Sequence, residues 1–122
     1  MKFSSVRLVT NNYERLVQFY KNVSAIEPRF LADGFAEIHF NGIVLAISDK
    51  HLIRLHNNGL AVAATNRSAI LEFKVGNVEA VLLRVNDAEV VMPVTIMPWG
   101  NTSLLLRDPD GSLVNVFSKP ST

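Results

Sequence analysis

Residues 98–117, PWGNTSLLLRDPDGSLVNVF, hold two apolar runs on either side of a tight-turn sequence. The central segment Asp108–Gly111 is typical of a turn, because proline presets φ at the second turn position and glycine tolerates a positive φ. The stretch therefore predicts a β-hairpin whose arms are residues 102–107 and 112–117. An apolar hairpin needs cover on at least one face, so we expect it to belong to a larger sheet.

Composition limits the class of protein. The chain has 122 residues, 48% of them hydrophobic, which is enough for one globular domain with its own core. The formal net charge is +1 and the basic residues are scattered, which argues against a nucleic-acid or membrane-surface partner. There is no cysteine, so disulfides and thiolate chemistry are excluded. No apolar run approaches the ~18 residues of a membrane span and no secretory leader is evident, so we expect a cytoplasmic protein.

The sequence predicts the same order of strands and helix twice, and the hairpin at residues 102–117 ends the second copy. Residues 3–10 predict a strand, and Asn12 is a suitable N-cap for a helix in which apolar residues recur at positions 13, 16, 17 and 20. Hairpin arms at residues 26–31 and 35–40 follow, and then a strand at residues 43–47.

The second copy begins with a strand at residues 69–75. Asn77 then caps a helix over residues 78–85, a short strand follows at residues 90–92, and the hairpin completes the unit. We expect two βαβββ modules, at about residues 1–50 and 68–122, joined by a linker at about residues 51–67 with a short helical turn. An α+β sandwich whose halves match by coincidence is the alternative.

Several of these segments resemble the vicinal oxygen chelate superfamily of glyoxalases, bleomycin-resistance proteins and dioxygenases. The matching pieces are VRLVTNN at 6–12, ERL at 14–16, FY at 19–20, LEFKV at 71–75, NVEA at 77–80, PWG at 98–100 and DPDGS at 108–112. The likeness covers essentially the whole chain. Asn12 and Asn77 depart from it, since such proteins usually carry aspartate there.

The resemblance implies an α+β fold in which two βαβββ modules form a curved mixed sheet around a cavity, and it implies a homodimer. Metal-dependent members ligate a divalent ion with inward His and Glu side chains on four strands. The corresponding positions here are Ser5, Ala46, Ile70 and Asn115. These side chains do not replace imidazoles and carboxylates around a divalent ion. We therefore expect no metal and no other cofactor.

Strand alternation divides the side chains between two faces. We expect Val6, Leu8, Ile43, Leu45, Ile47, Leu71, Phe73, Val75, Val114 and Val116 to face the helices. We expect Ser5, Arg7, Val9, Val44, Ala46, Ser48, Ile70, Glu72, Lys74, Leu113, Asn115 and Phe117 to line the opposite face, a mixed surface of the kind that binds small molecules.

The candidate ligand-binding residues are Arg7, Glu72, Lys74, Trp99, Asn115 and Phe117. Arg7 is either a fork for a ligand carboxylate or phosphate, or a structural partner of Glu72. Trp99 is either an aromatic wall at the pocket mouth or a core plug. Phe19 and Tyr20 are interpreted as core residues.

The remaining polar residues carry weaker signals. Glu37 and His39 share a strand face and offer an acid–base pair or half of a metal site, although an outer or edge face is the favoured interpretation. His51 and His56 are five residues apart, a poor spacing for helical metal ligands, and are interpreted as surface residues. Asp108 and Asp110 are assigned to the turn.

Two functions follow, from different classes. The first is a metal-free protein that binds or sequesters a small, partly apolar molecule that is neutral or anionic. The alternative is a glyoxalase-like lyase or isomerase, or a dioxygenase, that holds a divalent metal through displaced ligands such as Glu37 and His39. A third reading is a dimeric interaction module whose cavity is filled by its own side chains.

Overall fold

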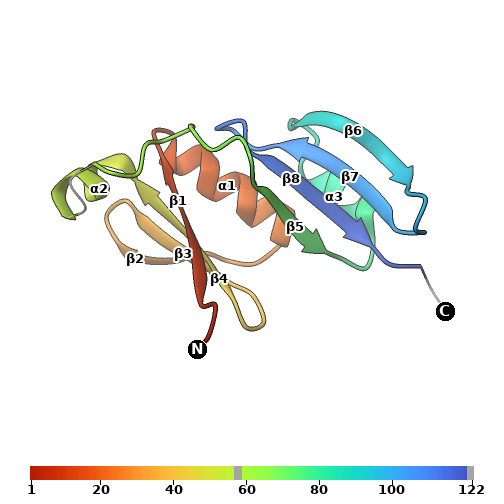
Figure 1. The fold of residues 1–122 in the computed structure, drawn as a ribbon, viewed down its shortest axis with the longest axis horizontal. Coiled ribbons are helices and arrows are strands. Elements are labelled where there is room, and N and C mark those ends of the chain that lie inside the picture. The colour runs from red at the N-terminus through yellow and green to blue at the C-terminus, as the bar shows by residue number, and fades with distance from the viewer. Residues whose placement is uncertain (57–58, 121–122) are drawn as a thin grey trace. The chain divides into compact units, whose positions relative to one another are not determined.

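The computed structural model describes residues 1–56 and 59–120, without the side chains of Ile53 and His56. The chain divides into two compact units, Met1–Thr65 and Asn66–Thr122. Each unit holds one four-stranded sheet, and the two βαβββ modules are the predicted ones (Figure 1). The prediction for the His56 side chain lies outside the described residues.

Unit 1 is a mixed sheet with one long helix. Its elements are β1 (Ser5–Thr10), α1 (Tyr13–Ser24), β2 (Arg29–Ala32), β3 (Phe35–His39), β4 (Val44–Asp49) and α2 (Lys50–His56). The strand order is β1-β4-β3-β2. β1 pairs with β4 in parallel, and the other neighbours are antiparallel. The predicted helical turn in the linker is thus a seven-residue helix that begins directly after β4.

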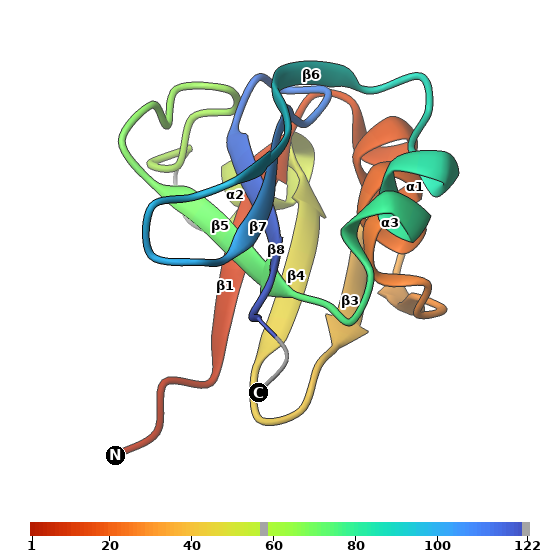
Figure 2. The ribbon, with the colours of Figure 1, turned by 90° about the vertical axis from the view of Figure 1, so that its right-hand side faces the viewer.

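The core of unit 1 lies between α1 and the sheet. The helix contacts β3 and β4 and can be followed in Figure 2. Its buried side chains are Leu16, Val17, Phe19, Tyr20 and Val23. Phe19 and Tyr20 are core residues as predicted, and their rings meet edge to face with centroids 5.0 Å apart. Ala25 ends the helix in the left-handed region, where its N–H donates to the Lys21 carbonyl.

Unit 2 repeats this plan with a shorter helix. Its elements are β5 (Ile70–Lys74), α3 (Val78–Arg84), β6 (Glu89–Ile96), β7 (Thr102–Arg107) and β8 (Leu113–Ser118), in the order β5-β8-β7-β6. α3 contacts β7 and β8, where Leu104, Leu106, Val114 and Val116 are fully buried. β6 is longer than the predicted residues 90–92, because register shifts near Met92 accommodate Pro93 in this edge strand.

The DPDG turn that organises the sequence forms as predicted. The Asp108 carboxylate accepts hydrogen bonds from the backbone N–H groups of Asp110 and Ser112, each 2.9 Å long. Gly111 has a φ of 87°, which only glycine adopts without strain. These carboxylates therefore shape the turn.

Two local predictions need correction. Ile43 is not a core residue: it precedes β4 and is 37% exposed. Asn77 caps α3 by accepting from the Ala80 N–H, but no side-chain cap bond joins Asn12 to α1. The Asn12 backbone N–H instead donates to Thr10 Oγ1. In the described part of the chain, no helix is both long and apolar enough to cross a membrane.

Candidate functional site

The face of the first sheet that points away from α1 carries a polar group. Directly paired residues of neighbouring strands share a face. Arg7 pairs with Ala46, and Ala46 with Glu37, so the arginine and the glutamate flank a small alanine in one row. The next row holds Ser5, Val44 and His39. The predicted placement of Ser5, Arg7, Val44 and Ala46 on one face is therefore confirmed.

Glu37 and His39 belong to this face and not to an edge. The prediction was an outer or edge face; β3 lies between β4 and β2, so the edge part of that prediction is wrong. Nε2 of His39 lies 2.9 Å from Oε1 of Glu37, and the two side chains are 33% and 24% exposed. The pair places a carboxylate next to Ala46, and an imidazole in the row of Ser5. Both neighbours are positions that the family resemblance gives to metal ligands.

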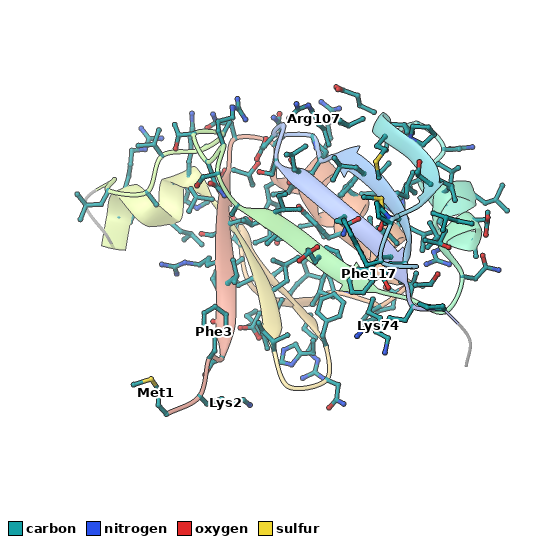
Figure 3. The ribbon with its side chains drawn as sticks, turned by 45° about the vertical axis from the view of Figure 1, so that its right-hand side comes forward. Met1, Lys2, Phe3, Lys74, Arg107 and Phe117 are labelled. Carbon is teal, nitrogen blue, oxygen red and sulfur yellow. The ribbon has the colours of Figure 1, made fainter. Side chains whose placement is uncertain are left out.

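The corresponding face of the second sheet also mixes apolar and polar side chains. Ile70 pairs with Leu113, Glu72 with Asn115, and Lys74 with Phe117. Nδ2 of Asn115 donates to Oε2 of Glu72 over 2.9 Å. Figure 3 shows Lys74 and Phe117 near one end of this sheet, while Arg107 marks the other end. Four of the six candidate ligand-binding residues thus lie in two neighbouring rows.

Glu72 therefore has a partner that the sequence did not indicate. Its carboxylate accepts from Asn115, the residue paired with it on β8. The alternative in which Arg7 is its structural partner would join the two units, and it stays a prediction.

Trp99 lies in the connection between β6 and β7 and is 67% exposed. A core plug would be buried, so that alternative is wrong. Its use as an aromatic wall for a ligand stays a prediction.

The four positions that correspond to metal ligands hold side chains that do not suit a divalent ion. The methyl group of Ala46 and the alkyl group of Ile70 offer no donor atom, and the Asn115 amide nitrogen is occupied by Glu72. A hydroxyl from Ser5 completes a set that does not suit a divalent transition metal. Among the side chains that the structure describes, no three His, Cys, Asp or Glu lie close enough to hold an ion together.

Sequence reasoning missed a second polar group, at the end of β4. Nδ1 of His51 lies 2.7 Å from Oδ2 of Asp49, and the His51 side chain is 40% exposed. Tyr13 lies nearby: burial raises the pKa of its phenol, and the carboxylates of Asp33 and Asp49 raise it further. An aspartate two residues before a histidine at a strand end was the available signal, but the contribution of Tyr13 depends on the fold.

The fold defines the class of protein. Two βαβββ modules, each with a parallel pair between its first and last strands, make up the glyoxalase/bleomycin resistance protein/dioxygenase fold, and the chain has this fold. The resemblance seen in the sequence is confirmed at that level. No protein-family model matches the sequence, and no curated protein matches it.

Three solved structures illustrate the likeness. A glyoxalase-related enzyme from Fulvimarina pelagi is 22% identical with a TM-score of 0.83, over 98% of this chain and 89% of the other. A glyoxalase/bleomycin resistance protein/dioxygenase family enzyme from Burkholderia phytofirmans PsJN is 13% identical with a TM-score of 0.83, over 98% and 100%. A glyoxalase/bleomycin resistance protein/dioxygenase from Nocardioides is 23% identical with a TM-score of 0.75, over 100% and 89%.

Proposed function

We propose that the chain binds a small, partly apolar molecule, neutral or anionic, without a metal, on the sheet faces that point away from the helices. The observation that carries the proposal is the pairing on the second sheet. There the hydrogen-bonded pair Glu72–Asn115 lies between the row of Ile70 and Leu113 and the row of Lys74 and Phe117, so apolar side chains flank a fixed polar pair. Ligand pockets commonly combine apolar walls with a small number of placed polar groups.

The polar groups suggest the chemistry of the ligand. The Glu72 carboxylate is held by Asn115, and the next row pairs the cationic residue Lys74 with the aromatic residue Phe117. A flat aromatic molecule with an oxygen or carboxylate substituent suits such a surface. The proposal includes a homodimer in the cytoplasm, and multi-angle light scattering on the purified protein tests the dimer.

Thermal shift with matched probes tests the binding. We expect 2-naphthol and 2-naphthoate to raise the Tm, whereas the cation of 2-naphthylmethylamine has a smaller effect. Replacing Lys74 with alanine is expected to weaken naphthoate about two- to fivefold while leaving naphthol unchanged. Lys119→Ala removes an exposed cation just after β8 and serves as the matched control. No rise in Tm with either compound would contradict the proposal.

The alternative is a metal-dependent isomerase or dioxygenase that uses Glu37 and His39. It is favoured by their position on the face that carries Ser5 and Ala46. Incubation with nickel, zinc, manganese or ferrous iron, followed by dialysis and metal analysis, separates the two functions. We expect no stoichiometric retention. Retention of one ion per chain that is lost in His39→Ala would establish the alternative and overturn the metal-free proposal.

A further inference from the structure

Unit 1 has a concave site at the end of β4, lined by residues other than those of the sheet face described above. It is an open pocket of about 460 Å³. Its walls are the first turn of α1, the turn between β2 and β3, the end of β4 and the start of α2. We call it the polar pocket. Its lining includes Tyr13, Glu14, Arg15, Asp33, Asp49 and His51.

One wall of the polar pocket is a fixed imidazole. Asp49 is anchored by its backbone N–H, which donates to the Gly34 carbonyl over 2.7 Å. Its Oδ1 accepts from the Lys50 N–H, and its Oδ2 lies 2.7 Å from Nδ1 of His51. A carboxylate only accepts hydrogen bonds, so we assign the imidazole proton to Nδ1. In the neutral form of this tautomer, Nε2 carries a lone pair that can accept a hydrogen bond.

The ring is also held by the backbone beneath it. A Cβ added at Gly34 would lie 2.8 Å from Cε1 of His51 and 3.0 Å from Cβ of Asp49. Only a glycine leaves room for the imidazole at this place. The acceptor atom of His51 is therefore set in position before any ligand arrives, which lowers the entropic cost of binding.

The electrostatics of the polar pocket favour a cation. Its lining includes the carboxylates of Glu14, Asp33 and Asp49 against the single guanidinium of Arg15. The phenol of Tyr13 also indicates a negative potential in the pocket. Burial raises its pKa, and the carboxylates of Asp33 and Asp49 raise it further. Among the described residues, Tyr13 Oη is a buried side-chain oxygen without a hydrogen-bond partner.

We propose that the polar pocket binds a small primary amine as its ammonium ion, with N–H groups donated to Nε2 of His51 and to the carboxylate of Asp33. An ammonium group carries the charge that the carboxylates favour and the donors that the acceptor atoms need. A quaternary ammonium has the charge without the donors, and an anion has the wrong sign. This inference stands apart from the proposed function, which concerns other residues and a different ligand chemistry.

An NMR titration with ethanolamine tests the proposal, followed at the backbone amides of Gly34, Asp49 and His51. We expect saturable shifts at these amides and at least about tenfold weaker binding of choline, which has the same charge but no N–H. Asp33→Asn should weaken ethanolamine by a similar factor. Asp87→Asn removes an exposed carboxylate from unit 2 and should leave the affinity unchanged. The amide spectrum of each variant reports whether it is folded.

Three results would overturn the proposal. They are the absence of saturable shifts at tens of millimolar ethanolamine, equal affinity for ethanolamine and choline, and equal affinity of the parent protein and Asp33→Asn. Inorganic phosphate is the probe for the opposite charge. If phosphate binds and ethanolamine does not, the helix terminus and Arg15 determine the ligand, and the proposed amine is wrong.

Discussion

The two sheets have the same backbone plan and different side chains on the face away from their helices. In unit 1, Arg7 and Glu37 flank Ala46, whereas in unit 2 the corresponding row holds Glu72, Asn115 and Leu105. The parallel pair of first and last strands occurs in both. The comparison shows that two sheets with the same strand pairing carry different side chains on the face away from their helices. Function therefore has to be argued from the rows and not from the fold.

The largest expected effect tests whether the two cores are equivalent. Ile38 on β3 and Leu106 on β7 pair with corresponding residues of β4 and β8, and both are 0% exposed. Replacing either with alanine should lower the free energy of unfolding by about 2–5 kcal/mol, because a cavity replaces buried methyl groups. Urea unfolding followed by circular dichroism measures the loss.

The same experiment examines the prediction of a single domain. If the two units unfold as one, each variant shows a single transition shifted to lower urea. Two separate transitions, with only one of them moved by each substitution, would contradict that prediction.

Two turn glycines sharpen the comparison within unit 1. Gly34 and Gly42 both have a positive φ, of 78° and 88°. Alanine at Gly42 meets nothing within 4 Å and should cost only the backbone strain of about 1–2 kcal/mol. Alanine at Gly34 meets His51 and Asp49 and should cost more, with the difference measured as a shift of the urea midpoint. Equal losses would mean that the imidazole moves away without cost.

The N-termini of α1 and α3 differ in whether an asparagine side chain caps the helix. Asn77→Ala removes the bond from the Ala80 N–H and should cost about 1 kcal/mol. Asn12→Ala should cost less, because the Asn12 side chain makes no cap bond to α1. Thermal unfolding of the two variants compares them directly. A larger loss at Asn12 would contradict the assignment of the caps.

The smallest effect concerns alkaline pH. A phenol whose pKa is raised in the folded state stabilises the protein fully below its ordinary value of 10.0, and this contribution is lost as the pH rises through the raised value. Tyr13→Phe should therefore lose less stability than the parent protein between neutral pH and pH values above 10.0. Unfolding free energies measured across this range test the sign. A steeper loss in the variant would contradict it.

Local patterns in the sequence were sufficient to predict the two modules and to predict which residues share one face of each sheet. The helical spacing of Leu16, Val17 and Tyr20 predicted the buried side of α1, and strand alternation placed Arg7 and Ala46 together. These features depend on residues close in sequence or on a period of two.

Local patterns could not predict the position of Glu37 and His39 in the sheet. Which face they occupy depends on the register between β3 and β4, and that register is set by the connection around Asn41 and Gly42. The polar pocket could not be predicted either, because its lining residues are far apart in the sequence. It brings the start of α1 together with the end of β4, and the perturbation of Tyr13 follows from burial that no local pattern reports.

The strand orders have a consequence for synthesis on the ribosome. In the described part of the chain, each sheet hydrogen-bonds only strands of its own unit. The sheet of unit 1 is complete at Asp49, so it needs no residue from the later half of the chain. The nascent protein can therefore close its first sheet, with β1 docked beside β4, while the strands of the second are still being translated.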